Sequence, residues 1–190
     1  ASLTTGTNNI VIGEQTLAST TTGSNNIALG SFTLSNNIIG TDNIGIGFEN
    51  LGNNIESGNI AIGSSVLQNN ESGKDNIAIG LLSLSSILTS YNIAIGYHTG
   101  WDTVTNSKSK VDEYVLFIGY LAGRDPSIPQ ATILSNIGAI GKNAKVAASN
   151  TYVIGAAPDP ITLIIYNDLN VIGNIAVGGT VDGVDIAAHA

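Results

Sequence analysis

Short apolar segments and polar links alternate along the chain in a regular repeat. The motif Asn-Ile-x-Ile/Leu-Gly occurs six times in the first half of the chain. The six copies occupy residues 9–13, 26–30, 43–47, 59–63, 76–80 and 92–96, so their glycines follow one another at steps of 17, 17, 16, 17 and 16 residues. Internal repetition at a nearly fixed step indicates a protein built of stacked, equivalent units.

Each unit predicts a short β-strand, a tight corner and a return. Ile-x-Ile alternates with period two, which is typical of a strand, and the glycine suits a bend where φ turns positive. We expect a second short strand around the leucine that follows the glycine, and then a return rich in turn-forming Asn, Ser, Thr and Gly. Leucine stands four residues after five of the glycines, at Leu17, Leu34, Leu51, Leu67 and Leu84.

One unit is too small to bury its own apolar side chains, so the units must stack coil on coil. No window holds the 3.6-residue period of a helix. The predicted fold is therefore all-β, a parallel β-solenoid or β-roll of 16–17-residue coils. The recurrent asparagine is expected to stack at equivalent positions, in a ladder that satisfies the backbone groups of the corners.

The two sides of the Ile-x-Ile strand predict an oligomer. Both isoleucines point to one side and the middle residue points to the other. The middle residues are Val11, Ala28, Gly45, Ala61, Ala78 and Ala94. A solvated side would be expected to carry Lys, Glu or Thr, so we expect the isoleucines to fill the core of the coil and the small residues to contact sister chains in a homotrimer. A monomeric solenoid with a solvated, alanine-rich face is the alternative.

The repeat becomes irregular after Gly96. The predicted organisation is regular β-solenoid repeats over residues 1–96, an irregular solenoid with insertion loops over 97–157, and a C-terminal triple-stranded shaft segment over 158–190. Long insertions on a solenoid project from one edge, where binding commonly occurs. An exposed aromatic ring beside polar groups can hold a sugar. The candidate receptor- or glycan-binding residues are Tyr97, His98, Trp101, Asp102 and Arg124. The alternative is that Tyr97 and Trp101 cap the repeat stack.

Composition and charge argue against several classes of function. The 190 residues include no Cys, and 14 Asp and Glu stand against 6 Lys and Arg, for a formal charge of −8. This balance argues against nucleic acid and against insertion at an anionic membrane. No disulfide or thiolate metal site is possible, and no cofactor or metal is expected. The only imidazoles are His98 and His189, and no Gly-x-Ser-x-Gly elbow or suitably spaced carboxylate pair is present, so we expect no enzymatic activity.

The units at residues 23–30 and 58–63 resemble the repeats of viral, phage-type tail-fibre and spike proteins. They are also similar to the head repeats of trimeric autotransporter adhesins, although the step of 16 or 17 residues is longer than in those adhesins. Residues 178–190 look like the segment that precedes a self-cleaving chaperone domain in many such fibres. The resemblance implies a homotrimeric fibre or spike on a virion that attaches to a host surface, with a surface glycan as the expected receptor. The alternatives are a bacterial surface adhesin head, a passive shaft and an ice-binding solenoid. Ice binding requires a regular array of threonines on one face, and the threonines of this chain are irregularly placed.

Overall fold

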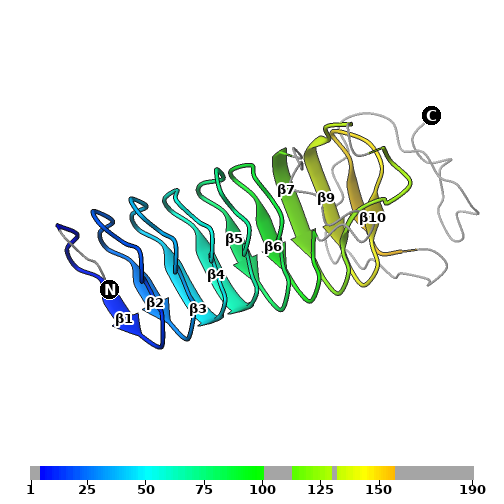
Figure 1. The fold of residues 1–190 in the computed structure, drawn as a ribbon. Coiled ribbons are helices and arrows are strands. Elements are labelled where there is room, and N and C mark those ends of the chain that lie inside the picture. The colour runs from blue at the N-terminus through cyan, green and yellow to red at the C-terminus, as the bar shows by residue number, and fades with distance from the viewer. Residues whose placement is uncertain (1–4, 101–112, 130–131, 157–190) are drawn as a thin grey trace, which may run out of the picture.

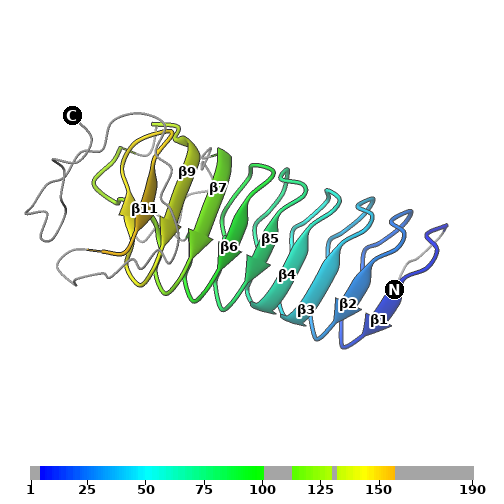
Figure 2. The same cartoon turned by 180° about the vertical axis from the view of Figure 1, so that it is seen from behind.

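The chain forms a stack of parallel coils, seen from opposite sides in Figures 1 and 2. The computed structural model describes residues 5–100, 113–129 and 132–156, and these contain strands and turns but no helix. Nine strands form one parallel sheet in the order β1-β2-β3-β4-β5-β6-β7-β9-β11, and β8 pairs with β10 in a second, small sheet. The predicted all-β architecture of stacked parallel units is confirmed. The proposed shaft segment, residues 158–190, lies outside the described residues.

Equivalent positions of successive motifs lie opposite one another. Ile10 pairs with Ile27, and Ile77 pairs with Ile93. The strands are β1 (Ile10–Ile12), β2 (Ile27–Leu29), β3 (Ile44–Phe48), β4 (Ile60–Ser64), β5 (Ile77–Ile79), β6 (Ile93–Ile95), β7 (Glu113–Ile118), β8 (Gly123–Arg124), β9 (Ser135–Ile140), β10 (Lys145–Val146) and β11 (Tyr152–Ile154). Because the sheet is parallel and in register, one residue type repeats as a rank along the stack.

From the second motif onwards, the interior of the coils holds the small middle residue of each regular motif, and this reverses the predicted orientation of the strands. The small residues Ala28, Ala61, Ala78 and Ala94 are fully buried, and so are the leucines Leu34, Leu51 and Leu67 on the opposite wall. The isoleucines point outwards, so the expectation that they fill the core while the alanines contact sister chains is wrong. The reason is space. A Cβ added to Gly45 would collide with Cγ2 of Thr33 and would lie 3.7 Å from Cγ of Leu34.

The motif glycine makes the corner after each strand. In the six regular motifs its φ lies between 115° and 139°, a region that L-residues rarely adopt. The coils also approach closely here, since a Cβ on Gly13 would lie 2.6 Å from the carbonyl carbon of Gly30. Both the backbone angle and the contact between coils therefore require glycine.

The segment after the corner is not the expected second strand in the regular coils. The residues two and four positions after the glycine are left-handed, as at Gln15 (φ 51°) and Leu17 (φ 49°). Residues of this conformation cannot continue an extended strand. The coils nevertheless remain hydrogen-bonded here, since the Leu17 N–H donates to the Thr33 carbonyl at 3.1 Å. The wall opposite the sheet is therefore a stack of turns that carries the buried leucines.

The predicted asparagine ladder is confirmed. Asn43 is fully buried, and its Oδ1 accepts a hydrogen bond from the Asn59 backbone N–H at 2.9 Å. Its Nδ2 donates to the Glu56 carbonyl at 2.8 Å, while its own N–H donates to Oδ1 of Asn26 at 2.9 Å. The same bond from backbone N–H to Oδ1 continues through Asn76 and Asn92 to Val115. Each asparagine thus pairs buried backbone groups that would otherwise be costly to leave unpaired.

Replacing one ladder asparagine should destabilise the fold strongly. Asn43→Ala leaves the buried backbone N–H of Asn59 without its acceptor, so we expect the free energy of unfolding to fall by about 1–3 kcal/mol. Asn36→Ala is the matched control, because Asn36 is exposed and its Nδ2 donates only to the side chain of Asn53. The control should lose less than about 1 kcal/mol. Urea unfolding followed by circular dichroism measures both, and equal losses would contradict the role of the ladder.

Candidate functional site

The outward side of the nine-stranded sheet is an apolar surface, which we call the isoleucine face. It consists of two ranks, from the first and third positions of Ile-x-Ile and its equivalents. The first rank is Ile10, Ile27, Ile44, Ile60, Ile77, Ile93, Leu116, Gly138 and Tyr152, and the second is Ile12, Leu29, Ile46, Ile62, Ile79, Ile95, Ile118, Ile140 and Ile154. Neither rank contains a charged residue.

The isoleucine face remains open to solvent in the single chain. Ile12 is 67 % exposed, and Ile46 and Ile95, in the interior of the sheet, keep 36 % and 38 % of their surface exposed. Nine strands at about 4.8 Å spacing give the face a length of about 38 Å. Exposed isoleucine can gain about 25 cal/mol for every Å² removed from water. A continuous apolar surface of this kind is typical of a contact site with another macromolecule.

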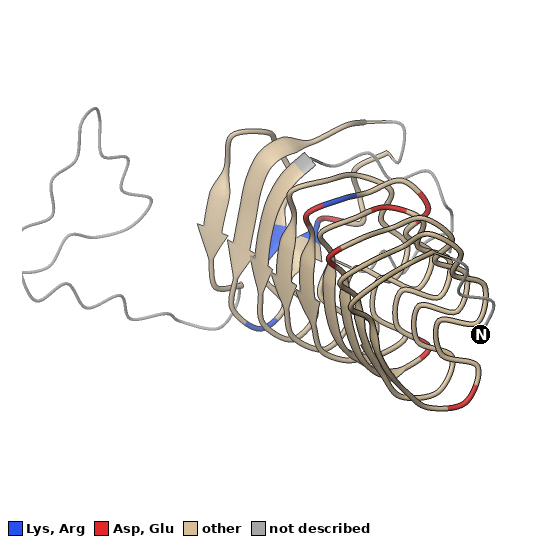
Figure 3. Ribbon diagram, turned by 90° about the vertical axis from the view of Figure 1, so that its left-hand side faces the viewer, with Lys and Arg blue, Asp and Glu red and all other residues tan. Residues whose placement is uncertain are grey.

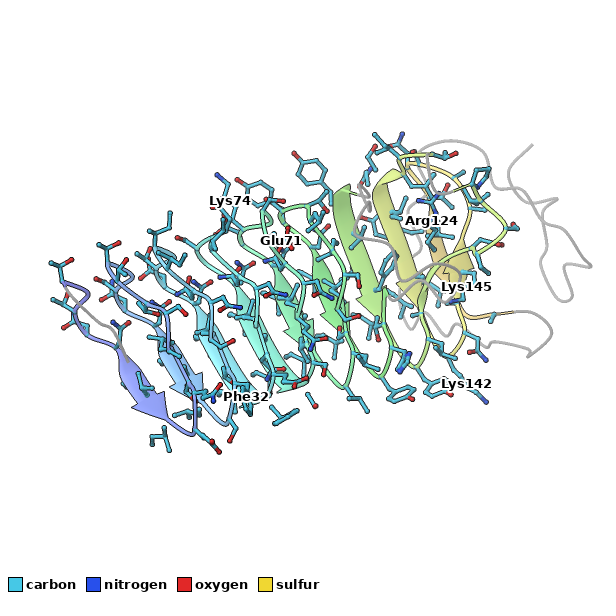
Figure 4. All side chains as sticks on the ribbon, in the orientation of Figure 1. Phe32, Glu71, Lys74, Arg124, Lys142 and Lys145 are labelled. Atoms are coloured by element: carbon cyan, nitrogen blue, oxygen red, sulfur yellow. The ribbon has the colours of Figure 1, made fainter. Side chains whose placement is uncertain are left out.

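In the part of the chain that the structure describes, the charged side chains lie away from the isoleucine face. Figure 3 shows most of the described acidic and basic residues at the corners and loops of the coils. Arg124 in β8 and Lys145 in β10 belong to the small sheet. Figure 4 labels Glu71 and Lys74 at one edge of the stack and Lys142 at the opposite edge. Among the described residues, no charged group therefore lies on the face, where its desolvation would oppose burial.

The predicted recognition residues lie on different parts of the fold. Tyr97 and His98 follow the corner glycine after β6, with their ring centroids 4.2 Å apart. Arg124 lies in β8, and its Nη2 donates to the Pro129 carbonyl at 2.7 Å. Trp101 and Asp102 lie outside the described residues. The site as a whole therefore stays a prediction, with Tyr97 and His98 as its one observed contact.

Sequence reasoning missed three pairs of aromatic rings. Tyr120 stacks on Tyr97 with the ring centroids 5.3 Å apart, and Tyr91 stacks on Tyr114 at 6.0 Å. Phe32 and Phe48 meet edge to face at 5.9 Å. The first pair could have been found from spacing, because Tyr97 and Tyr120 each stand directly after a motif glycine. In a parallel stack, such equivalent positions become neighbours.

The described residues include no group of three or more His, Cys, Asp or Glu placed to hold a metal ion. No helix with the length and apolar character of a membrane span occurs among them. No family model, curated protein or solved structure matches the chain.

The environment of His98 predicts its titration. Partial burial lowers the pKa of His98 below its ordinary value of 6.5, because desolvation disfavours the imidazolium. The unfolded chain therefore binds the proton more readily, so His98 disfavours the folded state as the pH falls through and below 6.5. We expect an NMR titration of the imidazole signals, assigned with His98→Gln, to give a pKa below 6.5. A value at or above 6.5 would contradict the packing of His98 at this corner.

Proposed function

We propose that this chain is a segment of a homotrimeric fibre or spike on a virion that attaches the particle to a host-cell surface glycan. The observation that carries the proposal is the isoleucine face, which is long, uncharged and exposed in the single chain. A second copy of the chain is a suitable partner, since its own isoleucine face has the same length and strand spacing. In this proposal the chain acts by assembly and binding, without catalysis.

Three copies arranged about an axis would bury all three isoleucine faces together. The corners and loops, which carry the charged residues, would then remain in water. The likeness of the Asn-Ile-Ala-Ile-Gly repeats to tail-fibre repeats supports the threefold arrangement and the place on a virion. A bacterial trimeric adhesin head would use the same face. The ice-binding alternative receives no support from the sheet, because neither outward rank contains threonine.

Charge introduced on the isoleucine face should separate the chains. Sedimentation of the native chain is expected to give a mass of about three times 19.4 kDa. The double variant Ile46→Lys, Ile79→Lys should sediment as a single chain, because burying two unpaired ammonium groups per chain costs several kcal/mol each. Its circular dichroism should remain that of the native fold, since both side chains point away from the core.

The matched control is Ile39→Lys, which changes an isoleucine that is 58 % exposed but lies outside the sheet. This variant should keep the native mass. A native chain that sediments at 19.4 kDa at micromolar concentration would contradict the trimer, as would an equal loss of mass in the control.

A further inference from the structure

A shallow hollow of about 170 Å³ opens on the wall of turns, away from the isoleucine face. We call it the Phe32 hollow. Its lining includes Phe32, Asn36, Glu49, Asn53 and Gln68, contributed by three successive coils. Figure 4 shows Phe32 at the edge of the stack where β2 and β3 end. Because the hollow lies outside the sheet, an assembly that buries the isoleucine face would leave it accessible.

Phe32 occupies an unusual backbone position for an aromatic residue. Its φ is 59°, in the left-handed region, where bulky residues are rare. The equivalent position in neighbouring coils holds Gln15, Glu49 and Ser65, which are all polar. The core does not require an aromatic ring there, because these neighbours stack with polar residues at the same position. The ring of Phe48 packs edge to face against Phe32 and fixes its orientation.

Polar groups beside Phe32 are held in place by their own hydrogen bonds. Nδ2 of Asn36 donates to Oδ1 of Asn53 at 3.0 Å, and Nδ2 of Asn53 donates to Oδ1 of Asn69 at 3.1 Å. Nε2 of Gln68 donates to Oε2 of Glu49 at 3.0 Å. Amides and a carboxylate together offer both donors and acceptors, which is the set that neighbouring hydroxyl groups need. Groups already fixed in position lose little entropy when a ligand binds.

The electrostatics of the hollow select against anions. The chain has no Lys or Arg before Lys74, whereas the Phe32 hollow contains Glu49. Glu14 belongs to the adjoining coil, where its carbonyl accepts the Phe32 N–H at 2.9 Å. A sialylated or sulfated sugar would be repelled by these carboxylates, without a cation from this part of the chain to offset them.

We propose that the Phe32 hollow is a binding subsite for a neutral glycan. One pyranose ring would lie with its C–H groups against the Phe32 ring, while its hydroxyls bond to Asn36, Asn53 and Glu49. The coil repeat places further amides, such as Asn69, along the same line, so an extended oligosaccharide could follow the stack. This inference rests on the proposed attachment function and gives it a second location, distinct from Tyr97 and His98.

The test compares two variants at the same left-handed position of different coils. Phe32→Gln removes the ring and introduces the residue that the chain itself uses at Gln15. Leu82→Gln is the matched control, because Leu82 has the same φ of 59° and lies three coils away. Each variant and the native chain are applied to an array of neutral hexose and N-acetylhexosamine oligosaccharides and their sialylated forms. Sedimentation and circular dichroism establish that assembly and fold are unchanged.

The native chain should bind neutral oligosaccharides at least tenfold better than their sialylated forms. Phe32→Gln should lose at least tenfold in binding, while Leu82→Gln should bind as the native chain does. Absence of neutral-glycan binding in the native chain would overturn the inference, as would a preference for sialylated forms or equal binding by both variants. Those outcomes leave the trimer intact, since a failure of the trimer would appear separately as a single-chain mass in sedimentation.

Discussion

The narrow interior of the coil is the constraint on which the rest of the structure depends. Leucines and polar side chains from the wall of turns fill most of the interior, so the strand wall can contribute only a small residue in most coils. Gly45 has no space even for a Cβ, and Ala61 and Ala78 are completely buried. Because successive strand residues alternate sides, the large isoleucines must point outwards. The apolar outer face is thus a direct consequence of how the core is filled.

Hydrogen bonding between coils keeps this arrangement uniform along the stack. The asparagine ladder repeats the same bond from backbone N–H to Oδ1 between coils, so the corners remain aligned and the outward residues form straight ranks. Straight ranks are what a flat contact with sister chains requires. The wall of turns does not take part in that proposed contact, and it carries varied residues, among them Phe32 and its polar neighbours. In the proposed function, assembly and recognition would therefore use different sides of one repeat.

The features that could be predicted from the sequence are those set by local backbone geometry. The period-two strands, the corner glycines and the asparagine ladder each follow from one motif. Which side of each strand faces the core could not be predicted, because it depends on the space left by leucines such as Leu34. The left-handed backbone of these leucines has no clear signal in the sequence. Tyr97 and His98 stood out as interruptions of the repeat. The Phe32 hollow did not, because its lining comes from three coils.

Thiol labelling tests most directly whether the alanine rank is the core and the isoleucine rank is the contact between chains. The chain has no cysteine, so Ile62→Cys and Ala61→Cys each introduce one thiol, on adjacent residues that point to opposite sides. In the native assembly both thiols should resist a maleimide reagent. In the Ile46→Lys, Ile79→Lys variant, which should be a single chain, the thiol at position 62 should react with the reagent, because that side chain is only partly buried there. The thiol at position 61 should stay protected, because that side chain is fully buried. Rapid labelling at position 62 in the native particle, or at position 61 in the folded single chain, would contradict the account.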